Sequence, residues 1–134
     1  MRKFLQEKKV LDISSFQINQ KFLPQIKDGD KRIFIIGGII KGAIKRIPKK
    51  GSIVSNIGQG GKAVTTTLTK NEYRIAKIVA SDLKKKHIIF AGIDLISNYL
   101  TGDINITSPT GLKNFKDLTG IDLAVDFWNF LEKR

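Results

Sequence analysis

An isoleucine-rich run split by two glycines limits the folds open to this chain more than any other feature. The segment at 32–36 reads Arg-Ile-Phe-Ile-Ile, and it is followed by Gly37, Gly38 and a second β-rich segment at 39–47. β-Branched and aromatic side chains favour strands, and a glycine pair between two such strands favours a tight turn. The sequence therefore predicts an antiparallel hairpin with strands at 32–36 and 39–47.

One helix is well marked at both ends. Thr69 stands three residues before Glu72, which is the spacing of a capping box, and apolar residues follow at helical intervals as far as the three lysines at 84–86. We also expect a second strand pair at 87–96 and 99–107, a short helix at 112–118 and a final helix at 121–131. These elements predict an α+β fold in which helices pack on an antiparallel β-sheet.

Three further expectations concern the rest of the chain. Residues 1–19 form an amphipathic segment, with helix at 1–15, and residues 18–23 are extended before Pro24. The segment 49–62 contains four glycines, which predicts a flexible loop. Trp128, beside Phe127 and Phe130 in the last helix, is interpreted as core packing.

The composition restricts the setting and the partners. The 134 residues suffice for one domain, and the absence of cysteine excludes disulfides and thiolate chemistry. The sequence has no apolar run long enough to cross a bilayer, so we expect no membrane partner and a cytoplasmic location. The formal charge of +12 indicates an anionic partner, although clustered lysines are equally typical of a solvated face.

Three oxygen-bearing side chains are the most informative candidates for chemistry. Asp94 lies on one predicted strand, and Asp103 and Asn105 lie on the strand expected to pair with it. Because Asp103 and Asn105 are two positions apart, their side chains project to the same side of that strand. Magnesium prefers oxygen ligands, and in nucleotide enzymes it is held by one or two carboxylates together with phosphates. A metal site is one interpretation, and a simple hairpin turn around Gly102 is the other.

Short motifs in a fixed order place these residues in a wider pattern. They are Asp28-Gly29-Asp30-Lys31-Arg32, Arg46-Ile47-Pro48, the glycine-rich loop, Gly92-Ile93-Asp94 and, after an acidic residue, Ile104-Asn105-Ile106-Thr107-Ser108-Pro109-Thr110. In this order, residues 20–134 resemble the C-terminal ATP-grasp subdomain of bacterial glutathione synthetases. The resemblance implies a ligase that joins γ-glutamylcysteine and glycine with ATP through an acyl phosphate, and it makes residues 1–19 a remnant of the preceding subdomain.

The resemblance also implies a role for individual residues. It places three groups of residues at the nucleotide. Gln20, Lys21, Phe22 and Leu23 would form the adenine hinge, and Asp30 would also lie at the nucleotide. Asn56, Gly60 and Gly61 belong to the loop at 49–62, which would be a lid. The resemblance places Asp94, Asp103 and Asn105 as ligands of Mg²⁺ or Mn²⁺. It places Arg32 and Arg46 near the phosphates as catalytic residues, and Ser108, Pro109 and Thr110 at the substrates. Arginine suits this task because it stays charged and presents a fork of donors, whereas the alternative for both arginines is surface charge beside a hairpin.

The chain departs from the family pattern in ways that bear on the site. Gly102 is inserted before Asp103, where the family usually has a glutamate, and Val54 stands where the loop usually carries an arginine. The insertion predicts a one-residue β-bulge. The N-terminal and central domains of such an enzyme do not fit ahead of residue 20, so we expect missing domains or a second polypeptide to complete the site.

Three hypotheses follow. The chain is a portion of a glutathione synthetase, in which case ATP-dependent carbon–nitrogen ligation needs the missing domains. It is instead a basic module that binds nucleotide, or less plausibly nucleic acid, without turnover. Or it is the product of a decaying gene, for which Val54 and the Gly102 insertion would be early signs.

Overall fold

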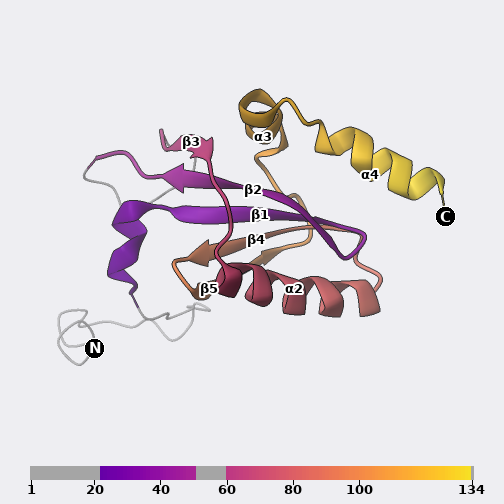
Figure 1. Cartoon of the computed structure of the whole chain (residues 1–134), viewed down its shortest axis with the longest axis horizontal. Helices are drawn as coiled ribbons and strands as arrows, with labels where there is room; N and C mark the ends of the chain where they lie inside the picture. The colour runs from indigo at the N-terminus through magenta and orange to yellow at the C-terminus, as the bar shows by residue number, and fades with distance from the viewer. Residues whose placement is uncertain (1–21, 51–59, 134) are drawn as a thin grey trace, which may run out of the picture.

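The computed structural model shows a five-stranded antiparallel sheet. It describes residues 22–50 and 60–133, so the predicted helix at 1–15, most of the glycine-rich loop, and Gln20, Lys21, Val54 and Asn56 lie outside the described residues. The strands are β1 (Asp30–Ile36), β2 (Ile39–Ile47), β3 (Lys62–Thr65), β4 (Phe90–Ile96) and β5 (Tyr99–Asn105). Their order across the sheet is β3-β2-β1-β4-β5 (Figure 1). The predicted hairpin is confirmed, since β1 pairs with β2 up to Ile36 opposite Ile39.

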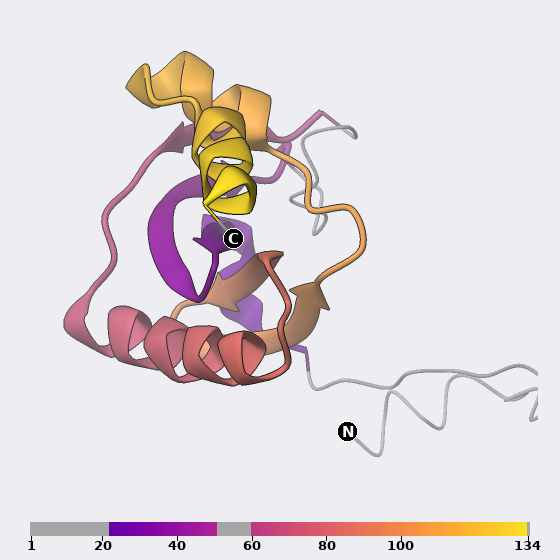
Figure 2. The same cartoon turned by 90° about the vertical axis from the view of Figure 1, so that its right-hand side faces the viewer.

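Helices cover both faces of this sheet. A 3-10 helix, η1 (Pro24–Asp28), leads into β1, and α2 (Lys70–Lys85) lies across one face. On the other face lie α3 (Leu112–Thr119) and α4 (Leu123–Glu132), as Figure 2 shows. The predicted α+β class is confirmed. None of the helices in the described part of the chain has the length and apolar character needed to cross a membrane.

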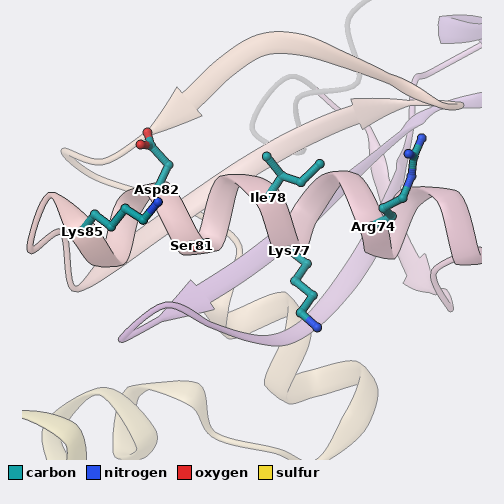
Figure 3. Close-up of a pocket in the computed structure, with 6 residues that line it drawn as sticks. All are labelled: Arg74, Lys77, Ile78, Ser81, Asp82 and Lys85. Carbon is teal, nitrogen blue, oxygen red and sulfur yellow. The ribbon is translucent and has the colours of Figure 1, made fainter.

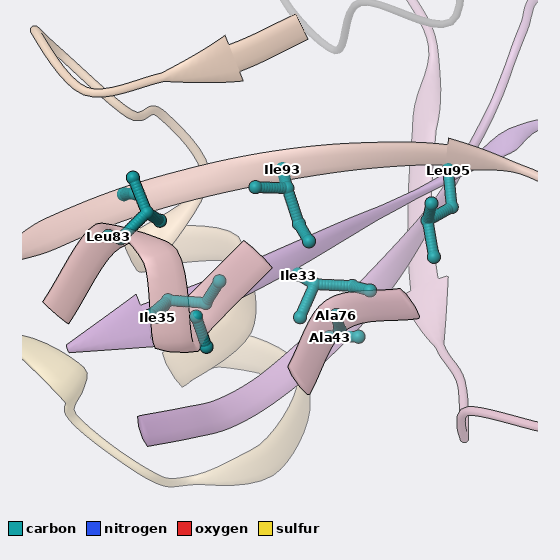
Figure 4. Close-up of a cluster of buried hydrophobic side chains, with 9 residues drawn as sticks. Ile33, Ile35, Ala43, Ala76, Leu83, Ile93 and Leu95 are labelled. Carbon is teal, nitrogen blue, oxygen red and sulfur yellow. The ribbon is translucent and has the colours of Figure 1, made fainter. Parts of the chain in front are cut away.

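Alternation along the central strand β1 divides the core into two halves. On the α2 side the buried residues are Ile33, Ile35, Ala43, Ala76, Ala80, Leu83, Ala91, Ile93 and Leu95 (Figure 4). On the α3 and α4 side they are Phe34, Ile36, Ile44, Phe115 and Leu123. Consecutive residues of β1 are apolar because both faces of this strand are buried.

A lysine from β1 reinforces the start of α2. The predicted capping box is present: Glu72 donates its N–H to the Thr69 hydroxyl at 3.2 Å and accepts the Thr69 N–H at 2.7 Å. Lys31 donates to the same Glu72 carboxylate at 2.7 Å and to the carbonyl oxygen of Thr67 at 2.9 Å. Because Glu72 is 4% exposed, these contacts tie the sheet to the helix in a protected position.

Replacing Glu72 with glutamine should lower stability in a pH-dependent way. Burial alone would raise the pKa of the Glu72 carboxyl, but hydrogen bonds from Lys31 and Thr69 hold the pKa below its ordinary value. A lowered pKa stabilises the fold above the ordinary value, and this contribution is lost as the pH falls through the folded-state value. We expect a cost of about 1–2 kcal/mol at neutral pH.

Urea unfolding of the two proteins across the acid range checks this expectation. The stability difference should be full at a pH above the ordinary glutamate pKa and should shrink as the pH falls through the lower folded-state pKa, because the protonated wild-type side chain then resembles glutamine. Glu132→Gln, at an exposed position, serves as the control. A cost that is the same at both ends of this range would contradict the role given to the carboxylate.

Some boundaries differ from those predicted. The strand β3 was not expected from the sequence, because four residues directly after a glycine-rich segment are too few to show a strand pattern. Lys62, which was expected in the loop, is the first residue of this strand. β4 begins at Phe90, not at 87, because His87 takes a positive φ of 56° in the turn that ends α2. α4 begins after Asp122, whose side chain caps it by accepting the N–H of Ala124.

The expectation for Trp128 is wrong. This side chain is 61% exposed and contacts Phe127 edge-on, with 5.5 Å between the ring centres. Only the side of α4 that carries Leu123, Phe127 and Phe130 packs on the sheet. The indole therefore lies on the solvent side of the helix.

The pairing of β4 with β5 is irregular beside the candidate metal residues. Ile93 pairs with Ile104 and Leu95 with Leu100, so Asp94 alone faces the three residues 101–103, which leaves two extra residues on β5. The predicted bulge is therefore present but is wider than the one-residue insertion that was expected. Since Ile93 and Ile104 are opposite one another, Asp94 and Asp103 still lie on the same face.

Candidate functional site

The candidate site continues the α3 face of the sheet beyond its apolar part. Arg32 lies two residues before Phe34 on β1, and Arg46 lies two residues after Ile44 on β2, so both share a face with the core around Phe115. β4 adds Asp94 directly opposite Arg32. One end of this face is thus apolar and the other is charged.

Two arginines and two aspartates form a continuous chain of ion pairs here. Arg32 donates to Asp94 from Nε at 2.5 Å and from Nη2 at 2.9 Å. Arg46 donates to Asp30, its partner across the sheet, from Nε at 2.9 Å and from Nη2. Nη2 of Arg46 also lies 2.8 Å from Oδ2 of Asp94. All four residues are at most 9% exposed, so Asp94 is a buried carboxylate shared by two guanidinium groups.

These contacts keep the network charged. Burial would raise the pKa of Asp94, but the hydrogen bond from Arg32 and the charges of both arginines hold it below its ordinary value. Burial would lower the pKa of Arg46, and the hydrogen bond to Asp30 with the charge of Asp94 raises it instead. At neutral pH the site therefore presents fixed charges in a place with little water.

Asp103 carries the charge that this network leaves over. Its carboxylate is 60% exposed and lies 3.8 Å from Nη2 of Arg32. Partial burial raises the pKa of Asp103, as do the hydrogen bond and the negative charge of Asp94. Two arginines and three aspartates sum to a formal charge of −1, and the exposed member is Asp103. A divalent cation would relieve the repulsion between the two carboxylates, and carboxylate oxygens are of the donor type that magnesium prefers.

Asn105 is already engaged with the segment that follows β5. Its Oδ1 accepts the N–H groups of Thr107 at 3.2 Å and Ser108 at 3.0 Å, and its Nδ2 donates to the Ser108 carbonyl oxygen at 3.3 Å. Within residues 22–50 and 60–133, no group of three or more histidine, cysteine, aspartate or glutamate side chains is arranged to hold a metal. A metal at Asp94 and Asp103 would thus need further oxygen donors, such as Asn105 after a small rearrangement, water or phosphate.

Arg32 also reaches the predicted substrate segment. Its Nη1 donates to the carbonyl oxygen of Thr110 at 3.2 Å. A Cβ added to Gly92 would lie 2.9 Å from Cδ of Arg32 and 3.1 Å from Cβ of Pro109, so the arginine and the proline meet over this glycine. Ser108 and Thr110 are exposed. No role for Gly92 was expected from its motif, although a glycine inside a strand commonly marks a close approach of another group.

The remaining predicted nucleotide residues lie on the segments that lead into β1 and β3. Phe22 is 60% exposed, and Leu23 is half-buried and extended, as expected before Pro24. Gly60 is exposed with a φ of 91°, and Gly61 is half-buried just before β3. Since Ala63 of β3 pairs with Arg46, Gly61 lies two residues from the level of the ion-pair network.

A shallow depression lies elsewhere, on the solvent side of α2. Its lining residues are Arg74, Lys77, Ile78, Ser81, Asp82 and Lys85 (Figure 3). α2 covers the face of the sheet opposite the ion-pair network. The depression is therefore separate from the candidate site, and its basic side chains mark one concentration of the positive charge.

Known proteins match most of the chain. Residues 3–120 match the sequence model for the prokaryotic glutathione synthetase ATP-grasp domain. The chain is 40% identical over 115 residues to a glutathione synthetase of Rhodopseudomonas palustris, covering 86% of the chain and 36% of that protein. It is 45% identical over 100 residues to that of Prochlorococcus marinus subsp. pastoris, covering 75% and 32%. For Neisseria meningitidis the identity is 40% over 109 residues, covering 81% and 34%. The chain thus spans about a third of the length of these relatives.

Proposed function

Because the chain belongs to the prokaryotic glutathione synthetase ATP-grasp domain family, we propose that it supplies the part of such a ligase that binds ATP with Mg²⁺ or Mn²⁺. The observation that carries this proposal is the exposed Asp103 carboxylate beside the arginine-bound Asp94, with one negative charge left unneutralised. The complete activity would be the joining of γ-glutamylcysteine and glycine. Since the chain spans a third of its relatives, we propose that the remaining domains, in the same or a second polypeptide, complete the site.

Asp103 and Asp94 are the proposed metal ligands, and Asn105 adds its amide oxygen by releasing the Thr107 N–H. When bound, the metal would neutralise phosphate charge and orient the nucleotide. The arginines support it from the buried side: Arg32 and Arg46 keep Asp94 ionised, and Asp30 orients Arg46 by accepting two hydrogen bonds from its guanidinium group. The surrounding roles stay as the motifs suggest: Gln20, Lys21, Phe22 and Leu23 at adenine, Asn56, Gly60 and Gly61 in a lid, and Ser108, Pro109 and Thr110 at the substrates.

The proposed reaction has two steps. A carboxylate oxygen of the peptide attacks the γ-phosphorus of ATP, the bond between that phosphorus and the ADP oxygen breaks, and an acyl phosphate forms. The amine of glycine then attacks the acyl carbon, the bond to phosphate breaks, and the nitrogen loses a proton. Charge builds on phosphoryl oxygens in the first step, and fixed cations such as Arg46 stabilise it. An acyl phosphate hydrolyses in water, which is the reason for a lid over the site.

Supplying the missing part of the enzyme tests the proposal. We expect this chain, co-expressed with the Rhodopseudomonas palustris synthetase lacking its matching region, to form glutathione in a reaction that needs ATP, Mg²⁺ and both polypeptides. The same pair with Asp103→Ala should co-purify but lose at least tenfold in rate, since a metal ligand is removed. A co-purifying wild-type pair without activity would contradict the proposal.

The basic side of α2 supports a second candidate, a module that binds nucleic acid without turnover. Arg74, Lys77 and Lys85 line the depression there, and the chain has a formal charge of +12. Such binding would weaken steeply with salt, because phosphate contacts release counterions. Titration of a labelled DNA duplex with the wild type, Lys77→Glu/Lys85→Glu and Asp103→Ala decides between the candidates. We expect no saturable duplex binding at physiological salt; tight binding lost only in the α2 variant would favour the module.

A further inference from the structure

Arg32 is the side chain through which two parts of the candidate site meet. Its Nε and Nη2 hold both oxygens of Asp94, and its Nη1 holds the carbonyl oxygen of Thr110. These partners belong to β4 and to the segment after β5. At 3% exposure, and with its donors directed at protein atoms, Arg32 has little of its guanidinium left for a ligand.

The position of Arg32 depends on the missing side chain at Gly92. A Cβ at that position would lie 2.9 Å from Cδ of Arg32 and 3.2 Å from its Nη1. The same Cβ would lie 3.1 Å from Cβ of Pro109. The proline ring is closed on the backbone, so it cannot move aside by a change of rotamer as an arginine side chain can. The arginine stem is the flexible neighbour, so it is the group that an added methyl would displace.

We propose that Arg32 and Gly92 form a positioning pair, in which Gly92 leaves the space that lets Arg32 fix the Asp94 carboxylate relative to the segment 108–110. This inference rests on the proposed function in one respect: the proposed function says which ligands Asp94 and the segment 108–110 bind. Arg32 acts through Asp94 and Thr110, and not as a direct phosphate ligand as its motif suggests. A lysine could not replace it, because one ammonium group cannot hold a carboxylate and a separate carbonyl with fixed forked geometry.

A double-mutant cycle measures this coupling. We expect Gly92→Ala to weaken Mn²⁺ binding to the full chain about tenfold, in line with the loss of a group that orients a metal ligand. In the Arg32→Ala background, which has no Cδ to displace, Gly92→Ala should change the Mn²⁺ affinity by less than about twofold. Arg32→Lys should bind Mn²⁺ more weakly than the wild type, as Arg32→Ala does.

A matched glycine separates positioning from loss of stability. A Cβ at Gly42 would lie 2.5 Å from the Phe115 ring, in the apolar half of the same face. Gly42→Ala should therefore lower the urea midpoint and leave the Mn²⁺ affinity of the folded chain unchanged. If it weakened Mn²⁺ as much as Gly92→Ala does, the positioning role would be overturned.

A second readout keeps this inference distinct from the proposed function. In the metal-free chain, the Arg32 Nε–H should exchange slowly with solvent, because it is bonded to a buried carboxylate, and Gly92→Ala should speed this exchange at least tenfold. If the folded wild type bound no Mn²⁺ but this contrast held, the metal site would fail and the positioning pair would stand. Unchanged exchange in Gly92→Ala, or an equal loss of Mn²⁺ affinity in the Arg32→Ala background, would overturn the pair.

Discussion

Asp94→Ala is expected to destabilise the chain by about 3–5 kcal/mol, because removing one partner of a buried ion pair leaves uncompensated charge. Asp94 is 5% exposed and is shared by two guanidinium groups. Arg46 would keep Asp30, but among the described residues Arg32 would keep only one carboxylate, that of Asp103 at 3.8 Å, besides the neutral carbonyl oxygen of Thr110. Urea unfolding at neutral pH, followed by circular dichroism, gives the change in the free energy of unfolding.

Asp103→Ala is the matched control for this prediction. The two aspartates lie side by side on one face, but the Asp103 side chain is 60% exposed. Its removal should cost less than about 1 kcal/mol, while abolishing metal binding as Asp94→Ala does. A small cost at both positions would mean that the buried network is not what holds Asp94 in place.

Gly29→Ala should also be strongly destabilising, at about 2–4 kcal/mol. Gly29 has a φ of 93°, and a Cβ there would lie 2.2 Å from the carbonyl oxygen and 3.0 Å from the carbonyl carbon of Arg46. Both are backbone atoms of β2, so no side chain can rotate away. The strand that carries Asp30 and Arg32 would have to shift away from the strand that carries Arg46.

Gly120→Ala isolates the backbone part of this cost. Gly120 has a φ of 76° and nothing within 4 Å of an added Cβ, so only the left-handed conformation is penalised, by about 1–2 kcal/mol. The excess measured at Gly29 in urea unfolding then reports the close approach to β2. Equal costs at the two glycines would contradict that approach.

The parts of the fold that could be predicted are those whose signals are local. The Gly37-Gly38 hairpin, the Thr69–Glu72 capping box and the two C-terminal helices each rest on neighbours in sequence, and the structure shows them. The strand β3 could not be predicted, because its four residues are too few to show the alternation typical of a strand. Trp128 was misplaced because it was grouped with Phe127 and Phe130, whereas only the side of α4 that carries those two rings packs on the sheet.

The candidate site shows the same limit. The motifs brought Arg32, Arg46 and Asp94 together, and the family they suggested is confirmed by the comparisons. They could not reveal that both arginines are held by aspartates, since a guanidinium fork suits carboxylate and phosphate equally. The partners of Arg32 and Arg46 are 62 and 16 residues away in sequence, so register and burial decide them. The roles of the individual residues toward ATP, metal and substrate stay predictions.

A calorimetric titration of the purified chain with ATP, with and without Mg²⁺, tests the proposed nucleotide and metal site most directly. Asp103→Ala/Asn105→Ala is titrated in parallel, after circular dichroism has shown that both proteins are folded. We expect saturable ATP binding that needs Mg²⁺ and is lost in the double variant. No ATP binding by the folded wild type, or binding that is the same without Mg²⁺ and in the variant, would contradict the proposed site.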